Sequence, residues 1–272
     1  MPEGVSSNVG RVVAVVPARM GSSRFPGKPL APLLGRPMVE HVVRRAAMCE
    51  RLDAAYVATC DEEIRAAVEG FGGEVIMTSA AHERASDRVA EAAAGLGAEV
   101  VVMIQGDEPM VTPRMIAASV APLYDDASVS CVNLARRVTR REEYVDRNTI
   151  KVLMNVRGDA VYFSRAPVPD GAFAPGTAAE SPPVFKQVCV IPFRRDFLRE
   201  FALLAPTPLE RAESIDMLRA IEHGRPVRLV EIEEETHAVD TPEDLRLVEA
   251  LMRDDPLVRL YGGARVRERR RL

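Results

Sequence analysis

The sequence contains no tryptophan, and aromatic residues make up only 5% of its 272 positions. A surface that stacks the bases of single-stranded nucleic acid is built from aromatic side chains, so we do not expect that kind of binding. Basic residues are not in excess either, because the net charge at pH 7 is -4. This balance argues against a broad basic face for nucleic acid and leaves room for a local basic pocket.

Cysteine is scarce, and the sequence has no CxxC pair and no Cys/His cluster. We therefore expect the four cysteines to be buried thiols in a reducing cytoplasm. No apolar run reaches 18 residues, and the first ten residues lack an apolar signal core. These absences predict a cytoplasmic protein without an export signal or a membrane span.

Short apolar runs alternate with amphipathic segments through the first half of the chain. We expect four strands, at residues 11–18, 54–60, 74–79 and 99–105, and three helices between them, at residues 38–50, 62–71 and 86–97. The runs show no polar alternation, which is typical of parallel strands buried on both faces. Asp61 and Ser86 stand where helix N-caps are expected. The pattern predicts an α/β fold with a mostly parallel sheet between helices.

After about residue 112 the alternation becomes less regular. We expect strands at residues 128–136, 149–155 and 226–234, and helices at residues 192–204, 206–224 and 240–254. Residues 165–185 are rich in Pro, Gly and Ala and predict a long loop. No repeat or linker divides the chain, so we expect one domain over residues 1–272 that ends in a basic tail, 252–272.

The stretch PARMGSSRFPGKP, residues 17–29, follows the first predicted strand. It lacks the spacing of a P-loop, because five residues separate Gly21 from Gly27, and Pro29 rather than Ser or Thr follows Lys28. The dinucleotide pattern G-x-G-x-x-G is absent as well. What remains is a phosphate loop of another kind, or a surface loop with solvated charges.

Three cations in this stretch, Arg19, Arg24 and Lys28, surround Gly21 and Ser22. Flexible backbone supplies N–H donors, and fixed cations offset the charge of a polyphosphate. The composition of the stretch therefore favours phosphate binding.

Two acidic residues follow other predicted strands. Asp107 comes after the strand at 99–105, and Asp240 comes after the strand at 226–234. Each has an alternative role as a helix N-cap. Because ligands bind beyond the carboxyl ends of parallel strands, we expect both acids to lie near the cationic loop. Mg²⁺ prefers one or two carboxylates together with substrate phosphates, so this arrangement suits metal-assisted phosphoryl chemistry.

Several motifs occur in a fixed order, and together they are far more specific than any one alone. They are AVVPARMGSSRFPGKPLAPLLGRPMVEHVVRRA, VATCDEEI, GGEVIMTSAAHERASDRVAEA, QGDEPMV, YFSRAPVP, PTPLE and AVDTPEDLRLVE. With them the chain resembles, over residues 12–251, the cytidylyltransferases that activate 3-deoxy-manno-octulosonate (Kdo), relatives of the acylneuraminate cytidylyltransferases. The resemblance implies a three-layer α/β/α Rossmann-like nucleotidyltransferase fold with a mostly parallel sheet, a homodimer, and CTP with Mg²⁺.

The resemblance also implies a reaction, in which an acceptor hydroxyl attacks the α-phosphorus of CTP and pyrophosphate leaves. It divides the chain into a CTP-binding half, 11–112, and an acceptor-binding and dimerisation half, 113–251. The positions that match the nucleotide site are Ala18, Arg19, Gly21, Ser22, Arg24, Lys28, Arg88 and Gln105. Asp107 and Asp240 match the Mg²⁺ ligands, and with Arg19 and Lys28 they form the implied catalytic set.

The implied acceptor site departs from the family pattern. Its residues are Arg165, Gln187, Ile191, Glu213 and Met217. Gln187 and Ile191 stand where the family motif HxGIYxYR has His and Tyr, and Met217 replaces the Gln of ExLEQLR. A pocket that hydrogen-bonds hydroxyl groups discriminates through those bonds. We therefore hypothesise a different small anionic acceptor: an amino- or deoxy-ulosonic acid, or a non-sugar anion such as a phosphonate. The alternative is a divergent Kdo enzyme.

Two other function classes fit less well. A glycosyltransferase with a similar sandwich is expected to carry a D-x-D acid pair, and the spacing in GDEP is different. An inactive nucleotide sensor is expected to have lost a cation or an acid, whereas Arg19, Lys28, Asp107 and Asp240 are all present.

Overall fold

The strand that precedes the cationic loop lies at the centre of the first of two sheets. The computed structural model describes residues 9–21, 24–173 and 182–261. The first sheet has the order β11-β6-β1-β4-β5, formed by β1 (Val12–Pro17), β4 (Ala54–Thr59), β5 (Glu74–Met77), β6 (Val100–Ile104) and β11 (Val190–Arg194). Only β11 runs antiparallel to its neighbour. The predicted mostly parallel central sheet is therefore confirmed.

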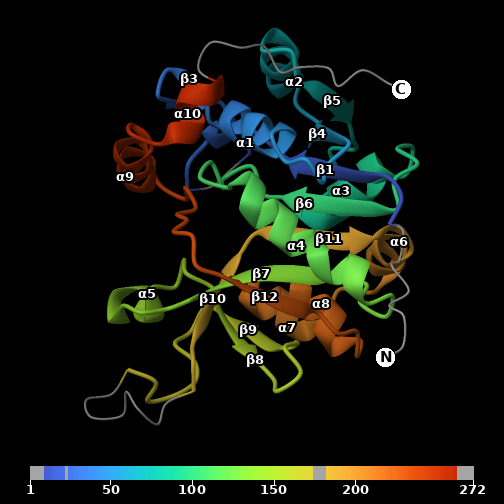
Figure 1. Cartoon of the computed structure of the whole chain (residues 1–272), viewed down its shortest axis with the longest axis vertical. Coiled ribbons are helices and arrows are strands. Elements are labelled where there is room, and N and C mark those ends of the chain that lie inside the picture. The colour runs from blue at the N-terminus through green and yellow to red at the C-terminus, as the bar shows by residue number, and fades with distance from the viewer. Residues whose placement is uncertain (1–8, 22–23, 174–181, 262–272) are drawn as a thin grey trace, which may run out of the picture.

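Helices cover both faces of this sheet (Figure 1). They are α1 (Met38–Ala47), α2 (Glu62–Gly70) and α4 (Pro113–Asp125) on one face, and α3 (Ala85–Ala93) and α6 (Arg195–Leu203) on the other. Alternate residues of β1 divide between the two faces. Val12, Ala14 and Val16 belong to the cluster that includes α1, α2 and α4, and Val13 and Val15 belong to the cluster that includes α3 and α6. Burial on both faces explains the uninterrupted apolar run in the sequence.

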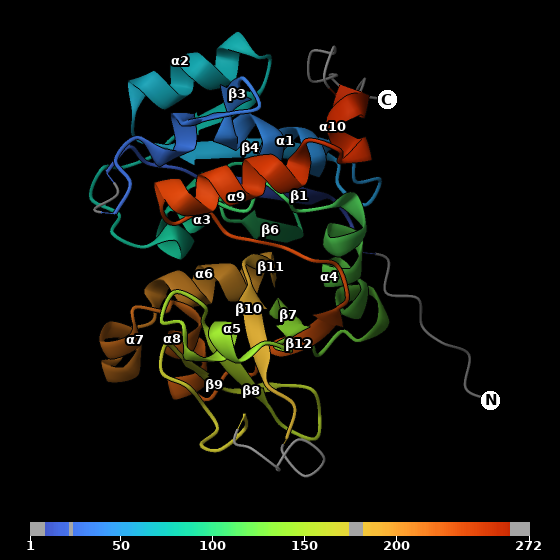
Figure 2. The same ribbon diagram turned by 90° about the vertical axis from the view of Figure 1, so that its left-hand side faces the viewer.

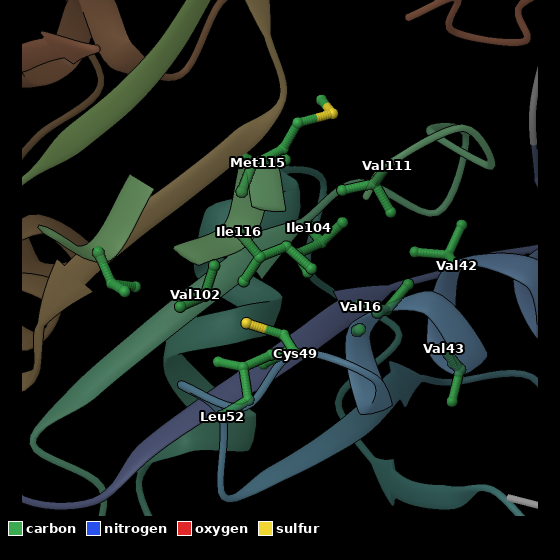
Figure 3. Packing of buried hydrophobic residues seen from close by; sticks show 14 of the residues in the cluster. Val16, Val42, Val43, Cys49, Leu52, Val102, Ile104, Val111, Met115 and Ile116 are labelled. Atoms are coloured by element: carbon green, nitrogen blue, oxygen red, sulfur yellow. The ribbon is translucent and has the colours of Figure 1, made fainter. Parts of the chain in front are cut away.

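The first of these two clusters packs around the end of β1, where the cationic loop begins. Figure 3 shows some of its members, in which Val16 and Ile104 from the sheet lie among Val42 of α1 and Ile116 of α4. All four side chains are fully buried. β1 therefore ends within a rigidly packed layer of strands and helices. The loop that carries the cations begins at a fixed position as a result.

The second half of the chain builds a further five-stranded sheet of order β12-β7-β10-β8-β9. Its strands are β7 (Val132–Arg137), β8 (Lys151–Met154), β9 (Ala160–Ser164), β10 (Phe185–Val188) and β12 (Arg228–Ile232). Its pairs are antiparallel except for β12 with β7. β10 and β11 are separated only by Cys189, so one continuous segment crosses from this sheet into the first.

Three helix predictions in the chain need correction. The helix expected at 192–204 begins only at Arg195, because the residues before it are strand β11. The single helix expected at 206–224 is two short helices, α7 (Pro208–Glu213) and α8 (Met217–Glu222), separated at Ser214, whose backbone is left-handed at φ 56° and ψ 51°. The N-cap of α3 is Arg84 rather than Ser86, which lies inside the first turn.

The remaining described elements are short or lie at the C-terminal end. They are the 3₁₀ turn η1 (Lys28–Leu30), β2 (Pro32–Leu33), β3 (Arg36–Pro37), α5 (Arg141–Val145), α9 (Pro242–Met252) and α10 (Pro256–Tyr261). α10 packs beside α1, as Figure 2 shows, and the Tyr261 hydroxyl lies 2.8 Å from Nδ1 of buried His41. No helix in the described part of the chain is long and apolar enough to cross a membrane.

A buried ion-pair network joins the two halves of the chain. Arg219 of α8 is 2% exposed and donates two hydrogen bonds to Glu210 of α7, at 2.9 and 2.7 Å. A third bond, at 2.9 Å, reaches Asp87 of α3. Helices from both halves are thus fastened by one guanidinium.

We expect Arg219→Met to destabilise the protein by about 3–5 kcal/mol, because it leaves the buried Glu210 carboxylate without its partner. Urea unfolding measures the difference. Arg246→Met is the matched control, since Arg246 is an exposed residue of α9 that pairs with exposed Glu243, and its effect should stay within about 0.5 kcal/mol. A loss below about 1 kcal/mol in Arg219→Met would contradict the structural role.

Candidate functional site

The two predicted acids meet beyond the carboxyl ends of the first sheet. Asp107 follows β6, and Asp240 lies on the segment that returns from β12 to α9. The two segments are fastened together by a hydrogen bond from the Val239 N–H to the Asp107 carbonyl, at 2.9 Å. Thr241 and Asp244 form a capping box at the start of α9, so the first turn of that helix is capped without the Asp240 carboxylate.

Lys28 lies between the two carboxylates. Its ammonium nitrogen is 2.6 Å from Oδ2 of Asp107 and 3.4 Å from Oδ1 of Asp240. Burial lowers the pKa of Lys28, but the charge and hydrogen bond of Asp107, followed by those of Asp240, outweigh it and raise the pKa above its usual value. Arg24 adds a second cation at 2.9 Å from Asp240. The site therefore brings both charge signs to one point, as the sequence predicted.

Backbone geometry explains why this loop has its composition. Gly27 adopts φ 72°, a left-handed conformation that favours glycine, and its N–H donates to the Met20 carbonyl at 3.1 Å. Pro29 occupies the first turn of η1, where its missing N–H costs nothing. At Gly106 a Cβ atom would lie 3.1 Å from the Pro17 carbonyl, so glycine allows the segments after β1 and β6 to approach.

Asp61 has a different role from the one predicted. It occupies the N-cap position of α2, but its side chain caps no helix N–H. Its carboxylate instead accepts a hydrogen bond from the Met20 N–H, at 2.8 Å. Asp61, which was expected to be a cap, therefore anchors the cationic loop to the segment that follows β4.

A cavity of about 380 Å³ lies over this charged centre. Among the predicted nucleotide-site residues, those that line it are Ala18, Arg19, Gly21, Arg24, Lys28, Arg88 and Gln105. Asp107 and Asp240 line it too. The predicted Ser22 lies outside the described residues. All of the predicted nucleotide-site residues that the structure describes therefore line one cavity.

Arg88 lies in the wall of this cavity and holds a neighbouring segment in place. It is buried, and it donates hydrogen bonds to the Thr78 hydroxyl at 2.5 Å and to the carbonyls of Ser79 and His82 at 3.4 and 3.5 Å. These bonds hold the segment between β5 and α3 against the cavity wall. His82 itself pairs with Glu91 of α3.

A second cavity, of about 710 Å³, adjoins the first and shares Arg19, Arg24, Gln105, Asp107 and Asp240 with it. The predicted acceptor residues that line it are Arg165, Gln187, Ile191 and Met217. Glu213 is not among the lining residues. Its carboxylate accepts hydrogen bonds from the Tyr162 hydroxyl, the Ser164 hydroxyl and the Arg165 N–H, at 3.0, 3.2 and 2.9 Å, so it holds the end of β9.

The second cavity has a mostly polar and charged lining, with an apolar part at Ile191 and Met217. Ile191 is 2% exposed and Met217 is 1% exposed, and both belong to a core cluster with Met103. The Gln187 amide nitrogen donates to Oδ1 of Asn133 at 2.7 Å, while the Asn133 amide nitrogen donates to two backbone carbonyls. The amide orientation of Gln187 is therefore fixed, and one N–H of it is already used.

Sequence reasoning missed several polar residues near these cavities. Glu108 is fully buried beside Asp107 and accepts hydrogen bonds from the Thr236 hydroxyl and the Cys189 N–H, at 2.8 and 3.3 Å. Burial, followed by the charge of Asp107, raises the pKa of Glu108 to about 7. Arg84 lines both cavities. Glu108 adjoins a motif acid in the sequence, but Arg84 reaches the site through contacts with residues after position 200, which no local pattern predicts.

The donor set fits a magnesium ion. Mg²⁺ uses one or two carboxylates and takes its other ligands from substrate phosphates and water. Asp107 and Asp240 supply two such carboxylates, while no group of three His, Cys, Asp or Glu residues among the described ranges forms a closed metal cage. The residues thus suit a metal that arrives with a phosphate ligand.

Fold and site together are those expected of an enzyme that binds a charged ligand beyond the carboxyl edge of a parallel sheet. A family model described as cytidylyltransferase matches residues 13–236, and the chain belongs to this family. It is accordingly a nucleotidyltransferase that uses CTP.

Its relatives agree with this assignment. The chain is 44% identical over 254 residues to a 3-deoxy-manno-octulosonate cytidylyltransferase of Geobacter metallireducens, covering 89% of this chain and 98% of the relative. It is 46% identical over 244 residues to the protein of that name from Myxococcus xanthus, covering 89% and 97%. A solved structure of CMP:2-keto-3-deoxy-manno-octonic acid synthetase complexed with CTP superimposes with a TM-score of 0.81 at 38% identity, covering 89% of this chain and 98% of that one. The expected nucleotidyltransferase fold is confirmed.

The raised pKa of Glu108 gives a pH-dependent prediction. Between its ordinary pKa of 4.5 and about 7 the folded state holds a proton that the unfolded state has released, so the buried carboxyl lowers stability as pH rises through this window. We expect Glu108→Gln to be more stable than the unchanged protein at about pH 8, by at most about 3 kcal/mol, and to lose this advantage near about pH 5.

Urea unfolding without Mg²⁺ at the two pH values measures this difference. Glu62→Gln is the control, because Glu62 is an exposed residue of α2. A Glu108→Gln variant with the same advantage at both pH values would show that the carboxyl does not change charge on folding.

Proposed function

We propose that this protein transfers CMP from CTP to a small acidic acceptor, either Kdo or a modified ulosonic acid, and releases pyrophosphate. The observation that carries the proposal is the charge arrangement at the sheet edge, where Lys28 lies 2.6 Å from Asp107 and 3.4 Å from Asp240, and Arg24 lies 2.9 Å from Asp240. A triphosphate with a bound cation matches this mixture of signs better than a simple anion or a simple cation does. The relatives named as Kdo cytidylyltransferases support the same chemistry.

The chain's own residues act by binding and positioning. Arg19, Arg24 and Lys28 offset the charge of the triphosphate, and Asp107 and Asp240 are the proposed ligands of Mg²⁺. Bound Mg²⁺ would neutralise charge on the phosphate oxygens and favour the ionised form of the acceptor hydroxyl. The acceptor oxygen forms a bond to the α-phosphorus of CTP, the bond to the bridging oxygen breaks, and pyrophosphate leaves with its electron pair. Positioning and electrostatics carry such a transfer without a side-chain nucleophile.

A second candidate acceptor is a non-sugar anion such as a phosphonate. The observation that favours it is the burial of Ile191 and Met217 at positions where the Kdo family has Tyr and Gln. An aliphatic chain and a thioether replace two groups that hydrogen-bond hydroxyls, so the inner wall offers less to a polyol. A role in lipopolysaccharide biosynthesis follows only if the acceptor is the sugar acid.

We also propose that the protein works as a cytoplasmic homodimer, as the resemblance implied. The edge strand β9 presents Val161, which is 51% exposed, on the second sheet. Light scattering coupled to size exclusion measures the mass in solution, and a monomer at micromolar concentration would contradict the dimer.

The metal assignment predicts that Asp107→Asn and Asp240→Asn each lower kcat for pyrophosphate release by at least about 100-fold, because each removes a proposed ligand of the ion. The assay contains CTP, Mg²⁺ and the acceptor that the unchanged enzyme uses. Asp196→Asn is the control, since Asp196 is 84% exposed on α6 and its described ion pair is with Arg195. Activity that survives both site substitutions would remove the two acids from the metal assignment.

The acceptor wall gives a separate prediction. We expect turnover of Kdo by the unchanged enzyme to be poor, with kcat/KM below about 10³ M⁻¹s⁻¹, and the combined change Gln187→His and Met217→Gln to raise it by about tenfold or more, because hydrogen-bonding groups return to the wall. Pyrophosphate release with CTP, Mg²⁺ and Kdo measures both. Turnover of Kdo by the unchanged enzyme at ordinary efficiency would instead establish a divergent Kdo enzyme.

A further inference from the structure

Two arginines from different halves of the chain are bound to consecutive residues at the break between α7 and α8. Arg84, the N-cap of α3, donates from its guanidinium to the Ser214 hydroxyl at 2.9 Å. Arg165, just after β9, donates from Nε to the Glu213 carbonyl at 2.8 Å. Both guanidinium groups are therefore tied to the same short break in the chain. Both side chains line the larger cavity, together with Ile191 and Met217.

The charge of Arg84 is only weakly compensated. Its nearest carboxylates are Glu210 at 3.8 Å and Asp216 at 3.7 Å, which is beyond hydrogen-bond distance. Both acids have closer partners: Glu210 binds Arg219 at 2.7 Å, and Asp216 accepts from the Ser86 hydroxyl at 2.7 Å. Arg84 therefore keeps donor N–H groups for a ligand, since its own hydrogen bond uses a single nitrogen.

The charge of Arg165 is not paired with a carboxylate within ion-pair distance anywhere in the described ranges. Its side chain donates to two backbone carbonyls, those of Glu213 and Arg147, at 2.8 and 3.2 Å. The Glu213 carboxylate itself binds the Tyr162 and Ser164 hydroxyls and the Arg165 backbone N–H. The second terminal nitrogen of the Arg165 guanidinium makes no hydrogen bond within the described structure.

An anion that contacts both guanidinium groups is attracted by two positive charges at once. Planar guanidinium groups bind carboxylate, phosphate and phosphonate oxygens with paired hydrogen bonds. Ile191 and Met217, which also line this cavity, offer no side-chain hydrogen-bond donor to a hydroxyl-rich molecule. The cavity lining carries acids as well as cations, and Arg84 and Arg165 supply guanidinium donors for an anion beside the break between α7 and α8.

We propose that Arg84 and Arg165 form a two-arginine acceptor site, and that the acceptor carries two negative charges: a phosphonate, or two carboxylates. This inference rests on the proposed function, because it describes the acceptor side of the same CMP transfer. Arg84 acts as a specificity-determining residue, since it adds the second positive charge beside Arg165. Kdo, with one carboxylate, satisfies only half of such a site.

The test measures binding to the full-length enzyme filled with α,β-methylene CTP and Mg²⁺, a complex that cannot react. The probes are malonate, phosphonoacetate and malonamate, in which an amide of nearly the same size replaces one carboxylate of malonate. We expect titration calorimetry to show both dianions binding at least about tenfold more tightly than malonamate. Arg84→Gln and Arg165→Gln should each reduce that ratio to below about threefold.

Arg65→Gln is the matched control, because Arg65 is an exposed arginine of α2 that pairs with Glu62 and Glu69, and its ratio should stay unchanged. Thermal unfolding without ligand separates recognition from folding. We expect Arg84→Gln to shift Tm by less than about 2 °C, because its carboxylate neighbours lie beyond hydrogen-bond distance and each has a closer partner. A purely structural Arg84 would lower Tm and leave the preference for dianions intact.

Several outcomes would overturn the inference. They are equal binding of malonate and malonamate, failure of both dianions to bind an enzyme that does bind the nucleotide analogue, a preference that persists in both arginine variants, or turnover of Kdo at kcat/KM above about 10⁴ M⁻¹s⁻¹. Failure to bind the nucleotide analogue at all is a different result, because it defeats the proposed CMP transfer itself and the inference with it.

Discussion

The ammonium of Lys28 between two carboxylates is the interaction on which the site's geometry depends. Asp107 and Asp240 come from strand ends far apart in the sequence, and two carboxylates without a nearby cation repel each other. With Lys28 at 2.6 Å from one and 3.4 Å from the other, its positive charge offsets that repulsion and the two acids lie close together. The site therefore depends on the backbone contacts that bring these three residues to one edge of the sheet.

Several local features serve that purpose. Gly106 lets the segment after β6 approach the Pro17 carbonyl, and Gly27 lets the loop turn back toward β1. Asp61 ties the loop to the neighbouring strand end through the Met20 N–H. These contacts use backbone groups, so they fix the path of the chain without occupying the cavity that the charged side chains line.

The nucleotide side of the site was predictable because its signals are local. A cationic loop and two acids each follow an apolar run, and the carboxyl ends of parallel strands share one edge of a sheet. The outcome agrees for Arg24, Lys28, Asp107 and Asp240, which three ion pairs join into one group. The assignments of these residues to CTP and Mg²⁺ remain predictions.

The acceptor side was less predictable because its contacts are distant in sequence. β10 and β11 are short strands inside a stretch where a helical pattern also fits, and β11 takes the place of the first turn expected for a helix at residue 192. No glycine or proline in the sequence marks the break at Ser214. Arg84 contacts Ser214 across 130 positions, so only the folded chain reveals that it binds the same break as Arg165.

The passage from β10 to β11 through Cys189 has a consequence for motion. Many enzymes close over their substrates by a hinge, in which a few residues between two rigid bodies change their backbone angles. Here Cys189 stands at that position, but its N–H is bonded to Glu108 and its carbonyl accepts from the Gln105 N–H, at 3.3 and 3.1 Å. A swing of one sheet against the other would break both bonds at the base of the site. These two bonds therefore oppose a hinge at Cys189 and favour a fixed spacing between the two cavities.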